Sequence, residues 1–133
     1  MKHLTVFLVI MHLIACSSNF PEQIHFRDWA KTPPMGWNSW DFYGPTVQEH
    51  EVKANADYMS ANLKEFGWEY VVVDIRWYVE NTRSGGYNQD DPRYVLDEYG
   101  RYLPAVNRFP SAKNGTGFKE LADYKHNAGL KFV

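Results

Sequence analysis

The residues best placed to do chemistry lie at the end of one apolar run. Residues 70–73 place three consecutive valines behind a tyrosine, and Asp74 closes the run. Such a run is typical of a strand buried on both faces of a parallel sheet. A carboxylate is costly to bury without a partner, so we expect Asp74 at the carboxyl end of the strand. Ligands bind at that end in parallel α/β folds.

The neighbours of Asp74 indicate what kind of ligand it would meet. Arg76 and Trp77 follow it closely, and a cation and an aromatic face beside a carboxylate suit a polar, ring-shaped ligand. Aromatic residues make up 17% of the chain, and many lie near this segment, so a carbohydrate site is one interpretation. The alternative is that Asp74 caps the following loop and that the aromatic residues belong to the core.

The segments before this run predict a β-α-β unit. Residues 35–40 favour a first strand in which Gly36 allows close backbone approach, and residues 41–45 favour a loop. A helix is expected from the capping-box spacing of Thr46 and Glu49 to the C-cap at Gly67. Its apolar stripe consists of Val52, Ala56, Met59, Leu63 and Phe66.

The rest of the chain repeats this alternation of helix and strand after a long connecting segment, residues 75–117, which we call the excursion. Residues 75–117 are rich in turn signals, with short runs at 94–96 and 101–103 that predict a small hairpin. Residues 118–128 favour a second helix, and residues 130–133 begin a third strand. The inner face of that helix is expected to carry Phe118, Leu121, Ala122 and the stem of Lys125. We therefore predict an α/β fold, the N-terminal part of a (β/α)8 TIM barrel truncated after about three strands.

The N-terminus has the pattern of an export signal. A short basic start precedes an apolar stretch over residues 4–15, which is too short to span a bilayer and is typical of a signal peptide. Cys16, the chain's single cysteine, follows small residues as in a bacterial lipobox. We predict a lipoprotein signal peptide at 1–15, a tether at 16–31 and an incomplete catalytic barrel domain at 32–133. The alternative is a chance cysteine in an ordinary signal peptide.

This pattern implies an exported bacterial lipoprotein, anchored to a membrane through a lipid on Cys16 and facing the periplasm or the cell surface. The chain carries a formal net charge of −2 and is 44% hydrophobic, as an ordinary globular protein is. Nothing in this charge balance suggests a nucleic-acid partner.

The opening of the predicted domain resembles a known family. Residues 32–40 read Thr-Pro-Pro-Met-Gly-Trp-Asn-Ser-Trp, which is similar to the start of glycoside hydrolase family 27, the α-galactosidase and α-N-acetylgalactosaminidase family. The resemblance covers about residues 32–133. Further matches lie at 67–70, 73–74, 77, 100–101, 108–110, 117–119, 121–124, 126 and 129–131.

The resemblance implies a (β/α)8 barrel that hydrolyses glycosides with retention, without metal or cofactor. Two aspartates would act as nucleophile and general acid/base, with carboxyl groups about 5–5.5 Å apart. In the family these follow the fourth and sixth strands, beyond Val133. We therefore expect no catalytic residue in this chain, and no activity from the 133 residues alone. The acidic residues of the excursion are interpreted as solvated turn residues: Asp90, Asp91, Asp97 and Glu98.

The resemblance also implies substrate contacts. Trp40 matches the family tryptophan that packs against the sugar, and Asp74 matches the first of two adjacent aspartates that bind galactose hydroxyls. Ile75 replaces the second aspartate, and an apolar side chain cannot accept a hydrogen bond from a hydroxyl. With Trp77, these residues form the predicted substrate-binding set. Ile75 is either a tolerated variant or a mark of the family's β-L-arabinopyranosidases, whose sugar lacks the exocyclic CH2OH group of galactose.

Three functions follow from these observations. The leading hypothesis is the N-terminal fragment of an exported retaining glycosidase that hydrolyses terminal α-D-galactosides. A second is a β-L-arabinopyranosidase of the same family. A third is a lipoprotein that binds sugar without catalysis.

Overall fold

The computed structural model of the protein describes residues 26–28 and 31–133. The chain divides into two units, Met1–Thr32 and Pro33–Val133. In the first, a 3-10 turn, η1 (Phe26–Asp28), is described, and Lys31 forms an ion pair with Asp28 at 3.7 Å. The predicted signal peptide, Cys16 and most of the predicted tether lie outside the described residues and stay predictions. The second unit carries the fold discussed below.

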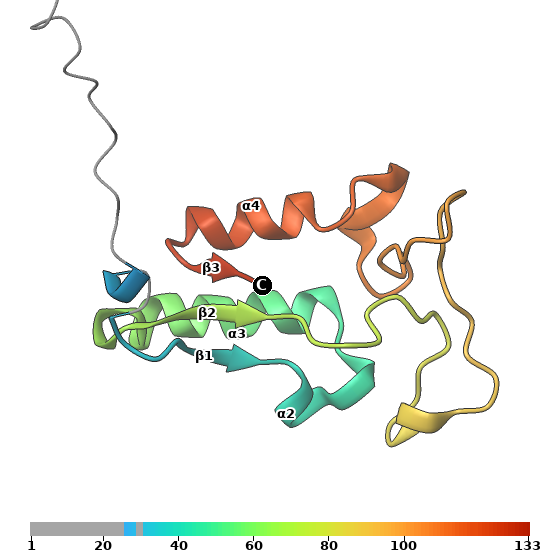
Figure 1. Ribbon diagram of the computed structural model, residues 1–133, viewed down its shortest axis with the longest axis horizontal. Coiled ribbons are helices and arrows are strands. Elements are labelled where there is room, and N and C mark those ends of the chain that lie inside the picture. The colour runs from blue at the N-terminus through green and yellow to red at the C-terminus, as the bar shows by residue number, and fades with distance from the viewer. Residues whose placement is uncertain (1–25, 29–30) are drawn as a thin grey trace, which may run out of the picture. The chain divides into compact units, whose positions relative to one another are not determined.

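A parallel three-stranded sheet forms the centre of Pro33–Val133 (Figure 1). Its strands are β1 (Met35–Asn38), β2 (Trp68–Val72) and β3 (Lys131–Phe132), in the order β1-β2-β3. Sequence order equals spatial order, and a helix lies between each pair of strands along the chain. The predicted β-α-β unit and α/β class are therefore confirmed, with the architecture of one part of a (β/α)8 barrel.

One face of the sheet is covered by the two long helices. Trp37, Val71 and Phe132 are register partners on this face, and Val71 is fully buried. Tyr70 and Lys131 pair on the opposite face, where the Lys131 ammonium lies 4.9 Å from the centre of the Tyr70 ring. Within the described chain, the helices cover one face of the sheet. The predicted burial of this strand on both faces is therefore found on one face only.

Gly36 has the close backbone approach expected of it. A Cβ built at this position would lie 2.1 Å from the carbonyl oxygen of Tyr70 on the neighbouring strand. No side chain fits at that distance, so the pairing of β1 with β2 requires glycine here.

The first long helix, α3 (Glu49–Asn62), buries Val52, Ala56 and Met59 as predicted. The stripe does not continue to Phe66, whose side chain is 66% exposed. The reason is that α3 ends at Asn62 and a separate 3-10 turn follows, which breaks the helical period.

The start of α3 also differs from the prediction. Gln48 is the N-cap, and its backbone N–H donates to Glu51 Oε2 at 2.7 Å, so the capping box is shifted by two residues. Thr46 instead closes the preceding turn η2 (Gly44–Thr46), since its hydroxyl donates to the Tyr43 carbonyl at 2.8 Å. A hydroxyl engaged in that turn is not available to cap the helix.

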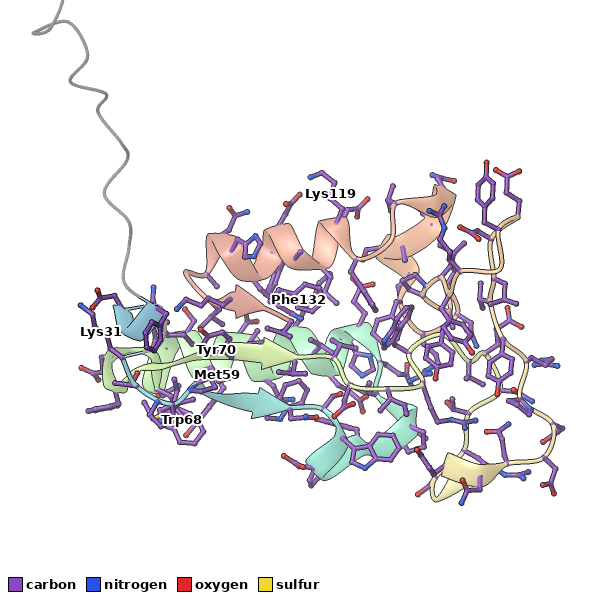
Figure 2. All side chains as sticks on the ribbon, viewed as in Figure 1. Lys31, Met59, Trp68, Tyr70, Lys119 and Phe132 are labelled. Carbon is purple, nitrogen blue, oxygen red and sulfur yellow. The ribbon has the colours of Figure 1, made fainter. Side chains whose placement is uncertain are left out.

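The second long helix, α4 (Lys119–Asn127), packs beside α3. Ser60 Oγ donates to the Ala128 carbonyl at 2.9 Å, and the Tyr124 hydroxyl donates to Asp57 at 2.7 Å. Figure 2 shows Lys119 on the outer side of α4 and Phe132 on the strand that this helix covers. Leu121 is fully buried, as the sequence predicted.

The excursion between β2 and α4 lies beyond the carboxyl ends of the strands (Figure 1). The predicted hairpin of 94–96 with 101–103 is present as a single antiparallel bridge, Leu96 with Tyr102, and a separate bridge joins Val79 and Tyr94. The excursion also contains two short 3-10 segments, η4 (Gly86–Asn88) and η5 (Pro110–Gly115). Long connections of this kind commonly form the rim of a site.

Lys125 is buried with its charged end, not only with its stem. The residue is fully buried, and its Nζ lies 3.6 Å from the centre of the Phe132 ring, without a hydrogen-bond partner among the described residues. Burial lowers the pKa of Lys125 to about 7, against the smaller opposing influence of the Glu49 carboxylate. The folded protein therefore favours the neutral amine.

This burial predicts a pH dependence of stability. The unfolded chain keeps the ordinary lysine pKa of about 10.4, so between pH 7 and pH 9 it binds more protons than the folded chain. The free energy of unfolding should therefore rise with pH over this range, with a slope approaching about 1.4 kcal/mol per pH unit. Urea unfolding at pH 7, 8 and 9 measures it. Lys125→Met should abolish the rise and Lys119→Met, on the exposed face of α4, should keep it; equal slopes in all three proteins would contradict the prediction.

Candidate functional site

An open hollow of about 400 Å³ lies at the carboxyl ends of β1 and β2. It is lined by Trp40, Asp74, Ile75 and Tyr87. Three of these four residues were predicted from the sequence to bind substrate, and the structure brings them together from segments more than thirty residues apart. The end of the sheet is the expected location of a site in a parallel α/β fold.

Asp74 lies just beyond the last residue of β2, with its carboxylate held from two sides. Asn38 Nδ2 donates to Asp74 Oδ2 at 2.8 Å, and the Ile75 N–H donates to Asp74 Oδ1 at 2.6 Å. The Asp74 N–H in turn donates to Ser39 Oγ at 2.9 Å. The carboxylate thus steadies the start of the loop and also lines the hollow. Each carboxylate oxygen can accept more than one hydrogen bond, so both remain able to accept from a ligand hydroxyl.

Asn38 and Ser39 hold the lining residues in position, and the sequence reasoning did not single them out. The Asn38 side chain donates to Asp74 and accepts from the Trp40 N–H at 2.8 Å, so it links two walls of the hollow. The fully buried Ser39 extends the strand pairing, since its N–H donates to the Val72 carbonyl at 3.1 Å. The sequence feature that could have indicated this role is the pair of polar residues between Trp37 and Trp40, at the end of the predicted strand.

The hydrogen bond from the Trp40 N–H to the Asn38 side chain also explains why the predicted end of the first strand was wrong. Residues 35–40 were predicted as strand, but β1 ends at Asn38 and Trp40 begins the short helix α2 (Trp40–Tyr43). An asparagine side chain that accepts from the N–H two residues later forms an Asx-turn, which directs the chain out of the strand. The turn places Trp40 at the hollow instead of within the sheet.

Tyr87 is the fourth lining residue, and the sequence reasoning did not single it out. It lies in η4, and its ring packs edge-to-face against Trp40 with centroids 5.6 Å apart and an interplanar angle of 84°. The signal was weak, because Tyr87 follows two glycines in turn-rich sequence where nothing fixes its distance from Asp74.

The structure places Trp77 outside this hollow. Its ring lies 5.3 Å from that of Phe118 and packs against the hydrophobic core below α4. Arg76 does not line the hollow either: its side chain is buried and its Nη1 donates to the Tyr87 carbonyl. The strand ends at Val72, so side chains beyond it no longer alternate between two faces, and adjacency to Asp74 in the sequence does not bring either side chain to this hollow.

Arg108 joins the loops around the site. Its two terminal nitrogens donate to four backbone carbonyls, those of Arg76, Val79, Pro45 and Val47, at 2.6–3.0 Å. The side chain is buried, and this burial lowers the pKa of Arg108 to about 10. The guanidinium still carries its charge at neutral pH. It therefore fixes the start of the excursion against the segment that follows α2.

The acidic residues of the excursion occupy turns, as interpreted from the sequence. Asp97 accepts from the N–H groups of Tyr99 and Arg101 and from Arg101 Nε, and these bonds, led by the Arg101 N–H, lower the pKa of its carboxyl. The others are exposed and do not line the hollow: Asp90, Asp91 and Glu98.

Over the part of the chain that the structure describes, no group of three or more His, Cys, Asp or Glu side chains is arranged to hold a metal ion. Over the same residues, no helix is both long enough and apolar enough to cross a bilayer.

Comparison with known proteins places this arrangement in a family. No family model matches the chain. It is 38% identical over 107 residues to α-galactosidase A of Cellvibrio japonicus, a match that covers 80% of this chain and 22% of that protein. The structure is similar to a GH27 β-L-arabinopyranosidase of Geobacillus stearothermophilus, with a TM-score of 0.76 and 63% identity, over 83% of this chain and 25% of that one. It is also similar to α-galactosidase I of Mortierella vinacea, with a TM-score of 0.59 and 30% identity, over 81% and 23%.

The chain thus spans between a fifth and a quarter of the length of the relatives it matches. Its three parallel strands and its helices correspond to part of the TIM barrel of these enzymes. The motif at residues 32–40 and the matches that follow it are explained by this relationship. The chain belongs to glycoside hydrolase family 27, in which it represents the N-terminal part of the barrel.

Proposed function

We propose that this chain supplies the sugar-holding part of a retaining glycosidase that hydrolyses β-L-arabinopyranosides. The observation that carries the proposal is the pairing of Asp74 with Ile75 in one hollow. The carboxylate would accept hydrogen bonds from ring hydroxyls, while Ile75 presents an apolar surface to the part of the sugar beside it. A sugar without the exocyclic CH2OH group has fewer polar atoms to leave unpaired there.

The degree of similarity favours the arabinopyranosidase over the α-galactosidase of known structure. The chain is 63% identical to the arabinopyranosidase and 30% identical to the α-galactosidase of known structure, over comparable lengths. A terminal α-D-galactoside is the second candidate substrate, favoured by the α-galactosidase named among the curated relatives. The two sugars share ring stereochemistry, so Trp40 and Asp74 would serve either one.

Within the described residues, Asp74 is the one carboxylate that lines the hollow. We assign it to binding sugar hydroxyls rather than to attack on the anomeric carbon, because it matches the family aspartate that binds hydroxyls, and two hydrogen-bond donors fix its orientation. A retaining mechanism needs two further carboxylates about 5–5.5 Å apart. The proposal assigns these to other strands of the barrel.

We also propose, from the N-terminal sequence, that the protein is exported and anchored by a lipid on Cys16. A twelve-residue apolar stretch followed by small residues and a cysteine supports it. A non-catalytic sugar-binding lipoprotein remains the third candidate, and it would share the hollow and the anchor but hydrolyse no glycoside.

Ile75→Asp tests the substrate choice in the enzyme that carries this chain. Restoring a second acceptor should move the ratio of kcat/KM for nitrophenyl α-D-galactopyranoside over nitrophenyl β-L-arabinopyranoside by about tenfold or more toward the galactoside. This is the size of one hydrogen bond to a charged group, about 1.5–3 kcal/mol.

Ile75→Val is the matched control, because it changes the size of the side chain and adds no acceptor. It should leave the ratio within about threefold of wild type, because Ile75 is partly exposed and the loss of one methylene weakens the contact with both sugars alike. An unchanged ratio in Ile75→Asp would refute the role of Ile75, while a wild-type enzyme that hydrolyses only the galactoside would establish the second candidate.

A further inference from the structure

Tyr87 is the lining residue that neither the strand pattern nor the opening motif accounts for. It lies twelve positions beyond Ile75, in the turn η4, and its side chain is 52% exposed. Its ring meets that of Trp40 at 84°, and the two rings together will be called the aromatic corner. The aromatic corner and the Asp74 carboxylate line the same hollow.

A buried hydrogen-bond network holds the backbone that carries this exposed ring. Arg76 donates from Nη1 to the Tyr87 carbonyl, and its own carbonyl accepts from Arg108 Nη1 at 2.8 Å. Arg108 Nη2 donates to the carbonyls of Pro45 and Val47, just beyond the helix that carries Trp40. The backbone at Tyr87 and the segment after the helix of Trp40 are thus connected through two buried guanidinium groups.

The backbone of Arg76 supports the same interpretation. Its φ is +73°, a left-handed conformation that is uncommon for a residue with a side chain. Such conformations persist where the surroundings hold them, and they concentrate at functional sites. Here the conformation directs the guanidinium away from the hollow and toward the turn that carries Tyr87.

The arrangement fits one face of a pyranose ring. Two aromatic walls at nearly a right angle offer apolar surface to the C–H groups of a sugar, and a carboxylate beside them accepts from its hydroxyls. We propose that Tyr87 contacts the sugar directly and that Arg76 is the positioning residue that presents it. This inference deepens the proposed function and rests on it for the identity of the sugar.

The first test replaces Tyr87 in the enzyme that carries this chain. Tyr87→Ala should raise KM for the preferred nitrophenyl glycoside by roughly three- to tenfold with kcat little changed, since a lost aromatic contact weakens ground state and transition state alike. Tyr87→Phe keeps the ring and should stay within twofold of wild type. Tyr99→Ala removes an exposed tyrosine of the same excursion that does not line the hollow, and it should change neither constant.

The second test separates positioning from general support of the fold. Arg76→Gly suits the left-handed backbone and removes the guanidinium, so it should raise KM about as much as Tyr87→Ala. In a Tyr87→Ala background it should add nothing, because no ring is left to position. A KM increase that persists in full in the double variant would show that Arg76 acts by another route and would overturn its assignment.

Binding of free L-arabinose and D-galactose, measured by calorimetry, distinguishes failure of the proposed function from failure of the inference about Tyr87. A wild-type protein that hydrolyses neither glycoside but binds a sugar, with affinity reduced in Tyr87→Ala and not in Tyr99→Ala, would refute the proposed function and support this inference. A protein whose sugar affinity and KM are the same with and without the Tyr87 ring would refute the inference and leave the proposed function standing.

Discussion

Replacing Arg108 with methionine is expected to lower the free energy of unfolding by about 4 kcal/mol or more. Four backbone carbonyls lose a charged donor, and each such bond ordinarily contributes about 1.5–3 kcal/mol. Methionine fills much of the space and relieves the cost of burying a charge, which offsets part of the loss. The carbonyls of Arg76, Val79, Pro45 and Val47 would lose their donor within a packed interior.

Urea unfolding of the protein that carries this chain measures the effect, with Arg93→Met as the matched control. Arg93 belongs to the same excursion, but its side chain is 70% exposed and its ion pair with Glu80 spans 3.7 Å, so its loss should change stability little. Arg108→Lys keeps the charge with fewer donors and should fall between wild type and Arg108→Met. Equal unfolding midpoints for Arg108→Met and Arg93→Met would show that the four bonds do not stabilise the fold.

The role of Arg108 also explains how a long excursion can form an ordered site wall. The excursion contains little regular secondary structure, although backbone hydrogen bonds close several of its turns, such as the bond from the Val95 N–H to the Tyr78 carbonyl at 2.9 Å. The buried Arg108 side chain adds bonds to carbonyls of both the excursion and the segment after α2. The hollow therefore depends on a residue that does not line it.

Those parts of the fold that depend on periodicity could be predicted from the sequence. The stripe of Val52, Ala56 and Met59 identified α3, and the apolar run before Asp74 identified β2 and the end at which a ligand would bind. These signals are local, since they depend on residues a few positions apart. The position of Asp74 beside Trp40 was implied only by the family resemblance, and the parallel pairing of β1 with β2 explains it.

The parts that could not be predicted depend on side chains that bond across large sequence distances. Arg108 donates to carbonyls more than sixty residues away, and Tyr87 contacts Trp40 from a connection with little regular secondary structure. No sequence pattern encodes such contacts. Trp77 was expected near the ligand because it lies near Asp74 in sequence, but the turn after β2 directs its ring into the core.

The central claim is that Asp74 holds the sugar in a family 27 barrel, and Asp74→Ala should have the largest effect on activity of any change discussed. Losing one or more charge-assisted hydrogen bonds of about 1.5–3 kcal/mol each should lower kcat/KM between roughly tenfold and several hundredfold. Loss of the bond from Asn38 would add to the effect, because Asn38 also holds the Trp40 N–H. Asp74→Asn separates the two contributions, since it keeps the shape of the side chain and removes its charge.

The most direct measurement is kcat/KM of the enzyme that carries this chain for nitrophenyl β-L-arabinopyranoside, in wild type, Asp74→Ala, Asp74→Asn and Asp91→Ala. Asp91 is an exposed carboxylate of the excursion outside the hollow, so its loss should leave kcat/KM unchanged. The account predicts a loss of about tenfold or more in both Asp74 variants. Wild-type kcat/KM in Asp74→Ala would contradict the account, because the carboxylate at the end of β2 would then hold no part of the sugar.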